Sequence, residues 1–232
     1  MGMAATAEKS RGKRRVVRTG RPPRELAGEV ESRILDAARR VFLERGLAGA
    51  SMDEIAGLAS AGKPTIYARF PSKEALFTAV VMRSVAANIA RFEHHTPTGA
   101  TVERRLESMA VIFLQWVLVS DAVRLMRVAI AEAPRFPDLA SSVYAMARER
   151  GAQTVGRLLA DAAQQSDELG ASPAFAPKRL TTTTRFFQDL VLFPLLLRAL
   201  FGEKLKQLCA EIEPHVARSV AFFLAACRHD VT

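Results

Sequence analysis

Apolar residues recur every three or four positions along most of the chain, which is the spacing of amphipathic helices. The first stripe predicts a helix over about residues 27–45, and Gly46 directly after it is suited to ending that helix. No segment of useful length alternates between apolar and polar residues as a β-strand does. The pattern therefore predicts an all-α protein of about nine helices. Apart from residues 51–69, the later helices are expected over residues 72–92, 102–117, 120–133, 137–163, 178–200 and 211–228.

Residues 51–76 (SMDEIAGLASAGKPTIYARFPSKEAL) carry the most specific pattern in the chain. Ser51 with Glu54 three residues later is a capping-box signature that opens a short helix. Residues 60–62 break this helix, and residues 63–69 predict a second short helix with an apolar side. Two short helices joined by a three-residue turn predict a helix-turn-helix, whose second helix can enter the major groove of DNA.

The same segment resembles the DNA-binding motif of the TetR family of bacterial transcriptional regulators. The resemblance extends over residues 21–77, and a weaker likeness to AefR-type regulators covers residues 124–139. Ser60 stands where the family usually has a turn glycine, so its backbone must avoid positive φ or accept a modest cost. Gly62 stands in place of a capping serine, which is an acceptable exchange. The matching positions are Ser51, Ile55, Ala56, Ala59, Thr65, Tyr67, Phe70, Lys73 and Leu76.

The resemblance implies a TetR-like division of the 232 residues. Residues 1–24 are expected to be a disordered basic arm, and residues 25–72 a three-helix DNA-binding domain. Residues 73–232 are expected to form a larger helical domain for effector binding and dimerisation. Family dimers pair their last two helices, and the apolar residues of 186–197 and 216–224 would supply that surface here. The sequence alone does not divide those residues between the dimer interface and the monomer core.

The formal net charge of +9 is concentrated near the predicted DNA-binding domain. Residues 1–77 hold 15 Lys and Arg against 9 Asp and Glu, whereas residues 78–232 hold 18 against 15. A basic surplus beside the motif favours DNA binding, because protein cations neutralise phosphates. Gly20-Arg21-Pro22 in the arm suggests insertion of Arg21 into a narrow minor groove, and a plain basic tail is the alternative.

Lysines at two helix starts are candidates for direct DNA contact. Lys73 begins the helix after the motif, where its ammonium and free backbone N–H groups suit a phosphate. Lys63 begins the second motif helix and is the candidate for reading guanine, while Pro64 offers only an apolar contact.

The resemblance to the family implies that three hydroxyl residues of the motif contact DNA. Ser51, Thr65 and Tyr67 are expected to donate to the phosphate backbone, and Arg69 adds positive charge. The alternatives are a half-buried aromatic for Tyr67 and a solvated charge for Arg69.

The middle helices carry large, adaptable side chains suited to lining an effector pocket. For each of them the alternative is an ordinary core position, and for Arg127 a salt bridge or a solvated charge. The candidates are Met109, Phe113, Trp116, Met126, Arg127, Tyr144 and Phe187.

Together these features predict a homodimeric transcriptional regulator that binds a double-stranded DNA operator. The family favours a repressor released from a palindromic operator by a small-molecule effector. The alternative is a non-specific architectural DNA binder or an adaptor that does not respond to a ligand.

Other classes of protein lack support in the sequence. We expect no enzyme and no cofactor, because no phosphate loop, zinc-ligand spacing or nucleophile motif is present. His94 and His95 are expected to be exposed loop residues rather than metal ligands. Cys209 and Cys227 suit buried or partly buried thiols in a reducing compartment, with a disulfide or redox switch as the alternative. With no secretory signal and only short apolar runs, we expect a cytoplasmic protein without membrane contact.

Overall fold

The computed structural model describes residues 24–165 and 172–228. Arg21 and the rest of the predicted arm up to residue 23 lie outside these ranges. Within them the protein is all-α, with nine α-helices, one 3-10 turn and no strand, which confirms the predicted fold class. In chain order the elements are α1 (Arg24–Gly49), α2 (Met52–Ala59), α3 (Lys63–Tyr67), α4 (Lys73–Glu93), α5 (Val102–Val117), α6 (Ser120–Glu132), α7 (Pro137–Gln165), η1 (Pro173–Phe175), α9 (Pro177–Leu200) and α10 (Leu205–Arg228).

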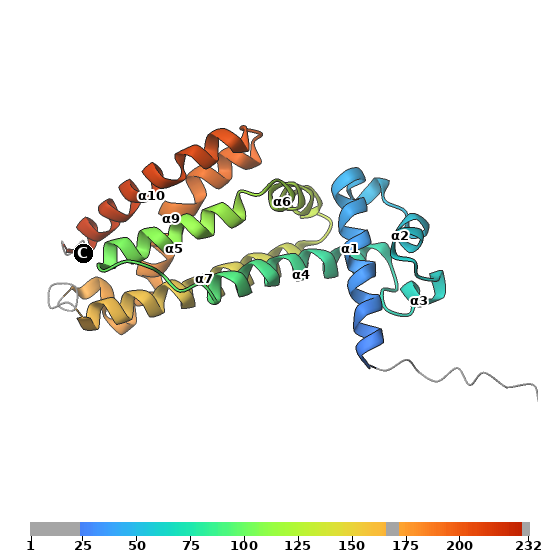
Figure 1. Ribbon diagram of the computed structural model, residues 1–232, viewed down its shortest axis with the longest axis horizontal. Coiled ribbons are helices and arrows are strands. Elements are labelled where there is room, and N and C mark those ends of the chain that lie inside the picture. The colour runs from blue at the N-terminus through green and yellow to red at the C-terminus, as the bar shows by residue number, and fades with distance from the viewer. Residues whose placement is uncertain (1–23, 166–171, 229–232) are drawn as a thin grey trace, which may run out of the picture.

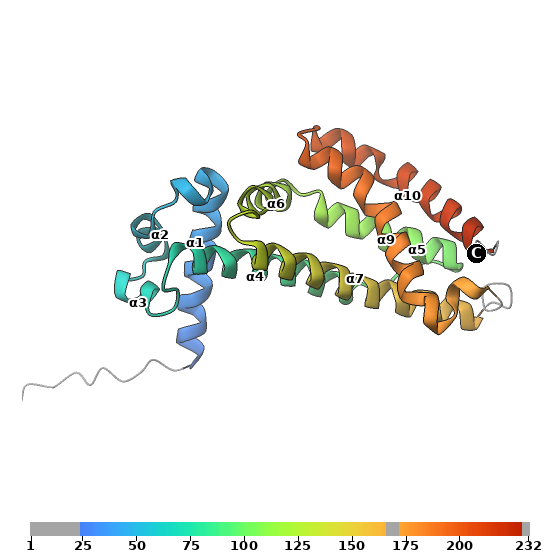
Figure 2. The same cartoon turned by 180° about the vertical axis from the view of Figure 1, so that it is seen from behind.

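The molecule is elongated, with α1, α2 and α3 grouped at one end (Figure 1). From this end α4 and α7 run side by side along the larger domain, as both ribbon views show (Figure 2). The helices α5, α9 and α10 pack together and complete the larger domain. Helix α6 contacts both α1 and α9, so it links the helix-turn-helix end to the larger domain.

The first helix bends at Gly46, whose φ of 68° and ψ of −178° are adopted almost exclusively by glycine. Regular helical geometry therefore stops where the sequence predicted, and one further turn extends α1 to Gly49. The bend places Leu47 in the core with only 1% of its surface exposed.

The core of the helix-turn-helix end is shared between helices that the predicted domain boundary separates. Phe42 of α1 packs edge-on against Phe77 of α4, with 5.3 Å between ring centroids. Leu76, Phe77, Val80 and Val81 of α4 belong to this core, and so does Leu125 of α6. The core of the helix-turn-helix end therefore extends past residue 72.

The last helix starts at Leu205, six residues before the predicted start at Glu211. Pro214 lies inside α10, where its missing N–H removes one backbone hydrogen bond. The buried side chains of Leu208, Ile212 and Val216 form one continuous apolar stripe through the proline. Burial of that stripe against α5 and α9 outweighs the loss of one backbone hydrogen bond.

By length and composition, α4 is the one described helix that on its own is apolar enough to cross a membrane. Its residues Leu76, Phe77, Val80 and Val81 are buried against α1 and neighbouring helices. These four apolar residues of α4 are therefore explained by packing in the protein core.

Candidate nucleic-acid interface and ligand cavity

Helix α2 begins at the predicted cap, with one change from the expected hydrogen-bond pattern. The Oγ of Ser51 accepts a hydrogen bond from the backbone N–H of Asp53 at 3.2 Å. Glu54 does not complete the reciprocal half of a capping box, because its Oε1 pairs with Arg45 at 2.8 Å. Ser51 is exposed at this position.

The turn between α2 and α3 contains a residue with positive φ, which was one of the two possibilities that the sequence allowed for Ser60. Ser60 has φ 49° and ψ 42°, so its backbone is left-handed and accepts the steric cost. Its N–H donates to Ala56 and Gly57 carbonyls, which ends α2. Gly62 is the N-cap of α3, as predicted, and Pro64 follows in the first turn, where a missing N–H is harmless.

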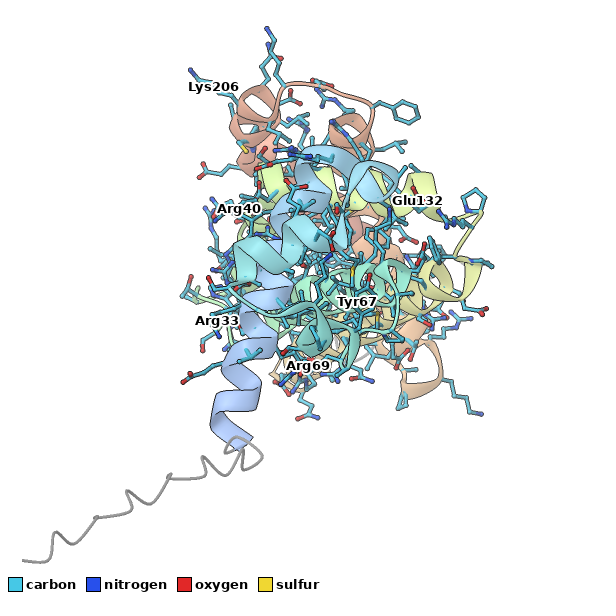
Figure 3. The ribbon with its side chains drawn as sticks, turned by 90° about the vertical axis from the view of Figure 1, so that its right-hand side faces the viewer. Arg33, Arg40, Tyr67, Arg69, Glu132 and Lys206 are labelled. Carbon is cyan, nitrogen blue, oxygen red and sulfur yellow. The ribbon has the colours of Figure 1, made fainter. Side chains whose placement is uncertain are left out.

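The short helix α3 buries one side and presents the other to solvent. Ile66 and Phe70 are buried, whereas Tyr67 is 48% exposed. Figure 3 looks onto this end of the molecule and shows Tyr67 and Arg69 on the same face. Lys63 and Pro64 are exposed, and Thr65 and Arg69 are half-buried. The structure thus groups the predicted DNA-contacting residues of α3 at one end of the molecule.

Lys63 forms an ion pair with a residue of the neighbouring helix. Its Nζ lies 2.7 Å from Asp53 Oδ2, and both side chains are about 60% exposed. Hydrogen bonding and attraction to Asp53 raise the pKa of the Lys63 ammonium above its ordinary value. The lysine is therefore fully charged near neutral pH, and a DNA group must compete with Asp53 for it.

Lys73 has a structural role that the sequence did not indicate. Its ammonium donates to the backbone carbonyls of Ala48 at 3.2 Å and Ala50 at 3.1 Å. These bonds attach the α1–α2 link to the N-terminus of α4, where Ser72 caps the helix as predicted. A phosphate contact by the Lys73 ammonium would have to share it with these two carbonyls.

Two further arginines were not identified from the sequence. Arg33 and Arg40 of α1 are exposed, and both are labelled at the helix-turn-helix end of the molecule in Figure 3. They are seven residues apart, which places them on one face of a helix. That spacing was the signal available in the sequence.

A small apolar cavity lies between α4, α5, α7 and α9. Its volume is about 20 Å³, and one polar residue, Gln188, is part of its wall. Met109, Phe113 and Phe187 from the predicted effector set line it, so the structure brings these three together. The remaining wall residues are Phe92, Ala110, Val155, Val191 and Leu192.

Four residues of the predicted effector set lie outside this cavity. Trp116 stacks edge-on with His95, 6.1 Å between centroids, beneath the guanidinium of Arg91. Met126 is partly buried in α6, and Tyr144 is 59% exposed on α7. Arg127 donates to the carbonyls of Ala199 and Leu200 instead of facing a pocket. Of the seven residues predicted to bind an effector, three therefore line the same cavity.

The adjacent surface carries a larger open groove of about 840 Å³ between α7, α9 and the end of α4. Its floor is formed by small residues of α7, and its rim is polar. The lining residues are Glu93, His94, Glu149, Ala152, Gln153, Gly156, Arg157, Ala160, Leu180, Thr181 and Thr184.

The loop histidines and the cysteines differ in part from expectation. His94 is exposed as predicted, whereas His95 is half-buried against Trp116. No group of His, Cys, Asp and Glu residues suited to a metal occurs in residues 24–165 and 172–228.

Cys227 is buried and free, and burial raises the pKa of its thiol to about 11. Cys209 is free and exposed, rather than partly buried.

Helices α9 and α10 expose a set of large apolar side chains. Phe186, Phe193 and Leu197 recur along α9, and Phe201 follows as its C-cap; these four side chains are between 43% and 85% exposed. On α10 Phe222 is 68% exposed. In contrast, Phe187, Val191, Leu196, Val216, Val220, Phe223 and Leu224 are buried within the monomer. The structure thus makes the division between core and surface that the sequence did not.

A helix-turn-helix with an exposed second helix, attached to a larger helical domain, defines a helix-turn-helix transcriptional regulator. The profile of the tetR family of bacterial regulatory proteins matches residues 34–80. The profile of the C-terminal domain of AefR-like transcriptional repressors matches residues 104–228. The chain therefore belongs to the TetR family, which confirms the resemblance, and it is a DNA-binding regulator rather than an enzyme.

Individual relatives agree with the family assignment. The transcriptional activator FasR of Mycolicibacterium smegmatis is 34% identical over 119 residues, or 50% of this chain. The chain spans about half of FasR, with 52% of its length covered. The regulator UidR of Escherichia coli strain K12 is 31% identical over 148 residues, 58% of this chain and 72% of UidR.

Solved structures of TetR-family proteins share the fold. A putative regulator from Mesorhizobium loti aligns with 86% of this chain and 97% of its own, with a TM-score of 0.72 and 27% identity. The Flavonoid-responsive Regulator FrrA aligns with 88% of this chain and 100% of its own, with a TM-score of 0.62 and 28% identity.

Proposed function

We propose that this TetR-family protein is a dimeric repressor that a small-molecule effector releases from a palindromic operator in the cytoplasm. The observation that carries the proposal is the course of α4. At its start Lys73 is bonded to the α1–α2 link of the DNA-binding end. At its other end Phe92 lines the apolar cavity and packs against Phe113, 4.8 Å between ring centroids.

This connection supports ligand response through a shift in conformational population. A ligand that enlarges the cavity would favour positions of Phe92 displaced from Phe113. Because α4 is one continuous helix, the displacement would move Lys73 and the α1–α2 link with it. Only a ligand with different affinities for the two states shifts the equilibrium between them.

DNA contact is assigned to the solvent-facing part of the helix-turn-helix. We assign base contact to Lys63 and Pro64, and phosphate contact to Ser51, Thr65, Tyr67 and Arg69. Their exposure at one end of the molecule supports this assignment. Arg33 and Arg40 of α1 extend the same basic end and are added as phosphate contacts. Arg21 stays a prediction for the adjacent minor groove.

Dimerisation is supported by the apolar stripe on α9 and by Phe222 of α10. An isolated regulator would leave Phe201 85% exposed beside Leu197 and Phe193. Pairing these helices with those of a second copy would bury the stripe. Two recognition helices then read two half-sites about one turn of DNA apart, which supplies the specificity that one short helix lacks.

The proposal also states the direction of regulation, which is repression rather than activation. The relatives include both a FasR activator and the AefR-like repressor profile. We assign repression because the matching C-terminal profile covers residues 104–228, most of the domain that would sense the effector. FrrA is named as flavonoid-responsive, which supports a small organic effector for this chain as well.

A DNase I footprint of the purified protein on the DNA flanking its own gene tests the proposal. We expect a protected site with two-fold symmetry at physiological salt. Phe222→Glu should make the protein monomeric by analytical ultracentrifugation and abolish that footprint. Diffuse protection that fades steeply with salt would identify a non-specific architectural binder instead.

A further inference from the structure

We propose that the cavity and the groove form one effector site, and that its ligand is an uncharged, ring-containing apolar compound with a hydroxyl or N–H group that donates to Gln188. This inference rests on the proposed ligand response. It names the class of effector and the side chain that recognises it.

Gln188 is the polar feature of an otherwise apolar cavity. Its Oε1 is buried and has no hydrogen-bond partner among the residues that the structure describes. The surrounding groups, such as Met109, Phe113 and Phe187, offer no donor. A buried acceptor without a donor is unfavourable, so a ligand that supplies one gains more than a ligand that does not.

The carboxamide of Gln188 lies close to the backbone of α7. A Cβ atom added at Gly151 would lie 2.3 Å from Gln188 Nε2. Glycine at position 151 therefore leaves the space that the amide occupies.

The groove adjoins the cavity along the seam between α7 and α9. Ala152 and Gly156 line the groove, and Val155 between them lines the cavity. On α9, Thr184 of the groove is one helical turn before Gln188 of the cavity. The groove volume of about 840 Å³ matches sites for drug-sized ligands, whereas 20 Å³ admits only part of one.

Entry of a ring requires the cavity to widen. Met109 is a flexible side chain that adapts to irregular shapes. Phe113 is partly buried rather than enclosed. The ring then lies on the small residues of the groove floor with its edge between Phe113 and Phe187.

The charges around the groove favour a neutral ligand. Glu93 pairs with Arg150 at 3.4 Å, and Glu149 pairs with Arg185 at 3.8 Å. Arg157 donates to the carbonyl of Gln153 on its own helix at 3.4 Å. A charged ligand would have to disrupt these contacts and carry its charge toward an apolar wall, which is costly.

Three probes of the same ring size test the class of ligand. Calorimetry with the full-length protein compares 2-naphthol, 2-methoxynaphthalene and 2-naphthoate at pH 7.5. The first has a donor, the second has none and the third is an anion. We expect 2-naphthol to bind about tenfold more tightly than 2-methoxynaphthalene, and 2-naphthoate to bind most weakly.

Substitutions in the protein test whether Gln188 is the residue that recognises the donor group of the ligand. Gln188→Leu should reduce the preference for 2-naphthol over 2-methoxynaphthalene to about one, because the acceptor is gone. Gln115→Leu makes the same change on an exposed position of α5 and should retain the preference. Ala160→Phe fills the groove floor and should weaken all three probes. Operator binding by each variant verifies that it folds.

Two sets of outcomes separate this inference from the proposed function. Operator binding without binding of any probe, or an unchanged preference in Gln188→Leu, overturns the site and its ligand class and leaves the regulator in place. Tightest binding by 2-naphthoate overturns the neutral class. Probe binding that depends on Gln188 but leaves operator affinity unchanged supports the site and overturns ligand release.

Discussion

Arg127 on α6 donates from Nε to the backbone carbonyl of Leu200, the last residue of α9, at 3.0 Å. Three residues earlier on the same helix, Arg124 donates to the carbonyl of Leu43 near the end of the regular part of α1. Asp121 pairs with Arg39 of α1 at 3.2 Å. Helix α6 therefore attaches the end of the DNA-binding domain to the end of α9.

Removing the donors of Arg127 should destabilise the protein slightly. Arg127→Met keeps most of the aliphatic stem and loses a cation at the C-terminus of a helix, worth about 0.3–1 kcal/mol. For a protein of this size we expect the Tm to fall by roughly 1–4 °C in thermal unfolding followed by circular dichroism. Arg104→Met, which breaks an exposed pair with Glu107 on α5, is the control and should change the Tm less. Equal losses in both variants would contradict a special role for Arg127.

Asp53→Asn should strengthen operator binding. The change frees Lys63 from its ion pair and removes a negative charge beside the DNA-binding face. Because exposed ion pairs are weak, we expect an increase of about two- to fivefold in affinity by fluorescence anisotropy. Asp138→Asn makes the same charge change on α7 and is expected to have little effect. Weaker binding by Asp53→Asn would show that the pair positions Lys63 for DNA instead of competing with it.

Ser60→Gly should stabilise the protein. Left-handed backbone costs a non-glycine residue about 1–2 kcal/mol, and the greater freedom of glycine in the unfolded chain offsets about 0.5–1 kcal/mol of that. The net gain is about 0.5–1 kcal/mol, which chemical denaturation measures. Ser60→Val should have the opposite effect, because a β-branched side chain tolerates this geometry least. A lower stability of the glycine variant would show that the serine side chain has a compensating contact.

Acid should weaken the turn between α9 and α10. Arg198 donates to Glu203 and Glu211, with Nη1 2.6 Å from Glu211 Oε2. This hydrogen bond lowers the pKa of the Glu211 carboxyl below its ordinary value. A lowered pKa in the folded state adds stability above the unfolded pKa, and the contribution disappears as pH falls through the folded value.

The Arg198 contribution is measurable as the slope of Tm against pH between 3 and 7. The wild-type protein should lose Tm more steeply below about pH 4.5 than Arg198→Gln or Glu211→Gln does. Both variants should flatten this acid branch, since each removes the contact between Arg198 and Glu211. Parallel curves for all three proteins would show that other carboxylates control acid stability.

The helix-turn-helix was predictable because its signals are local. Ser51 and Ser72 cap the helices that follow them, and Gly46 ends the regular part of α1. Each of these positions depends on a few neighbouring backbone groups, so the order of residues is sufficient. Apolar periodicity likewise predicted the helices of the larger domain, except that the last helix begins at Leu205, six residues before the predicted start.

Contacts between segments distant in the sequence decided which apolar side chains are buried and which partners the polar and charged side chains have. Phe186 and Phe187 are adjacent and chemically identical, yet one is exposed on α9 and the other lines the cavity. The Lys73 ammonium binds carbonyls more than twenty residues away, and the unpaired Gln188 acceptor exists only because four helices meet around it.

The sequence by itself therefore determined the family, the all-α class and the DNA-binding motif, since these depend on helical spacing and local capping. The tertiary structure decided which residues form the core, the candidate effector site and the exposed stripe of α9. Amphipathic spacing shows that a side of a helix is apolar, but what covers that side depends on how the other helices pack against it.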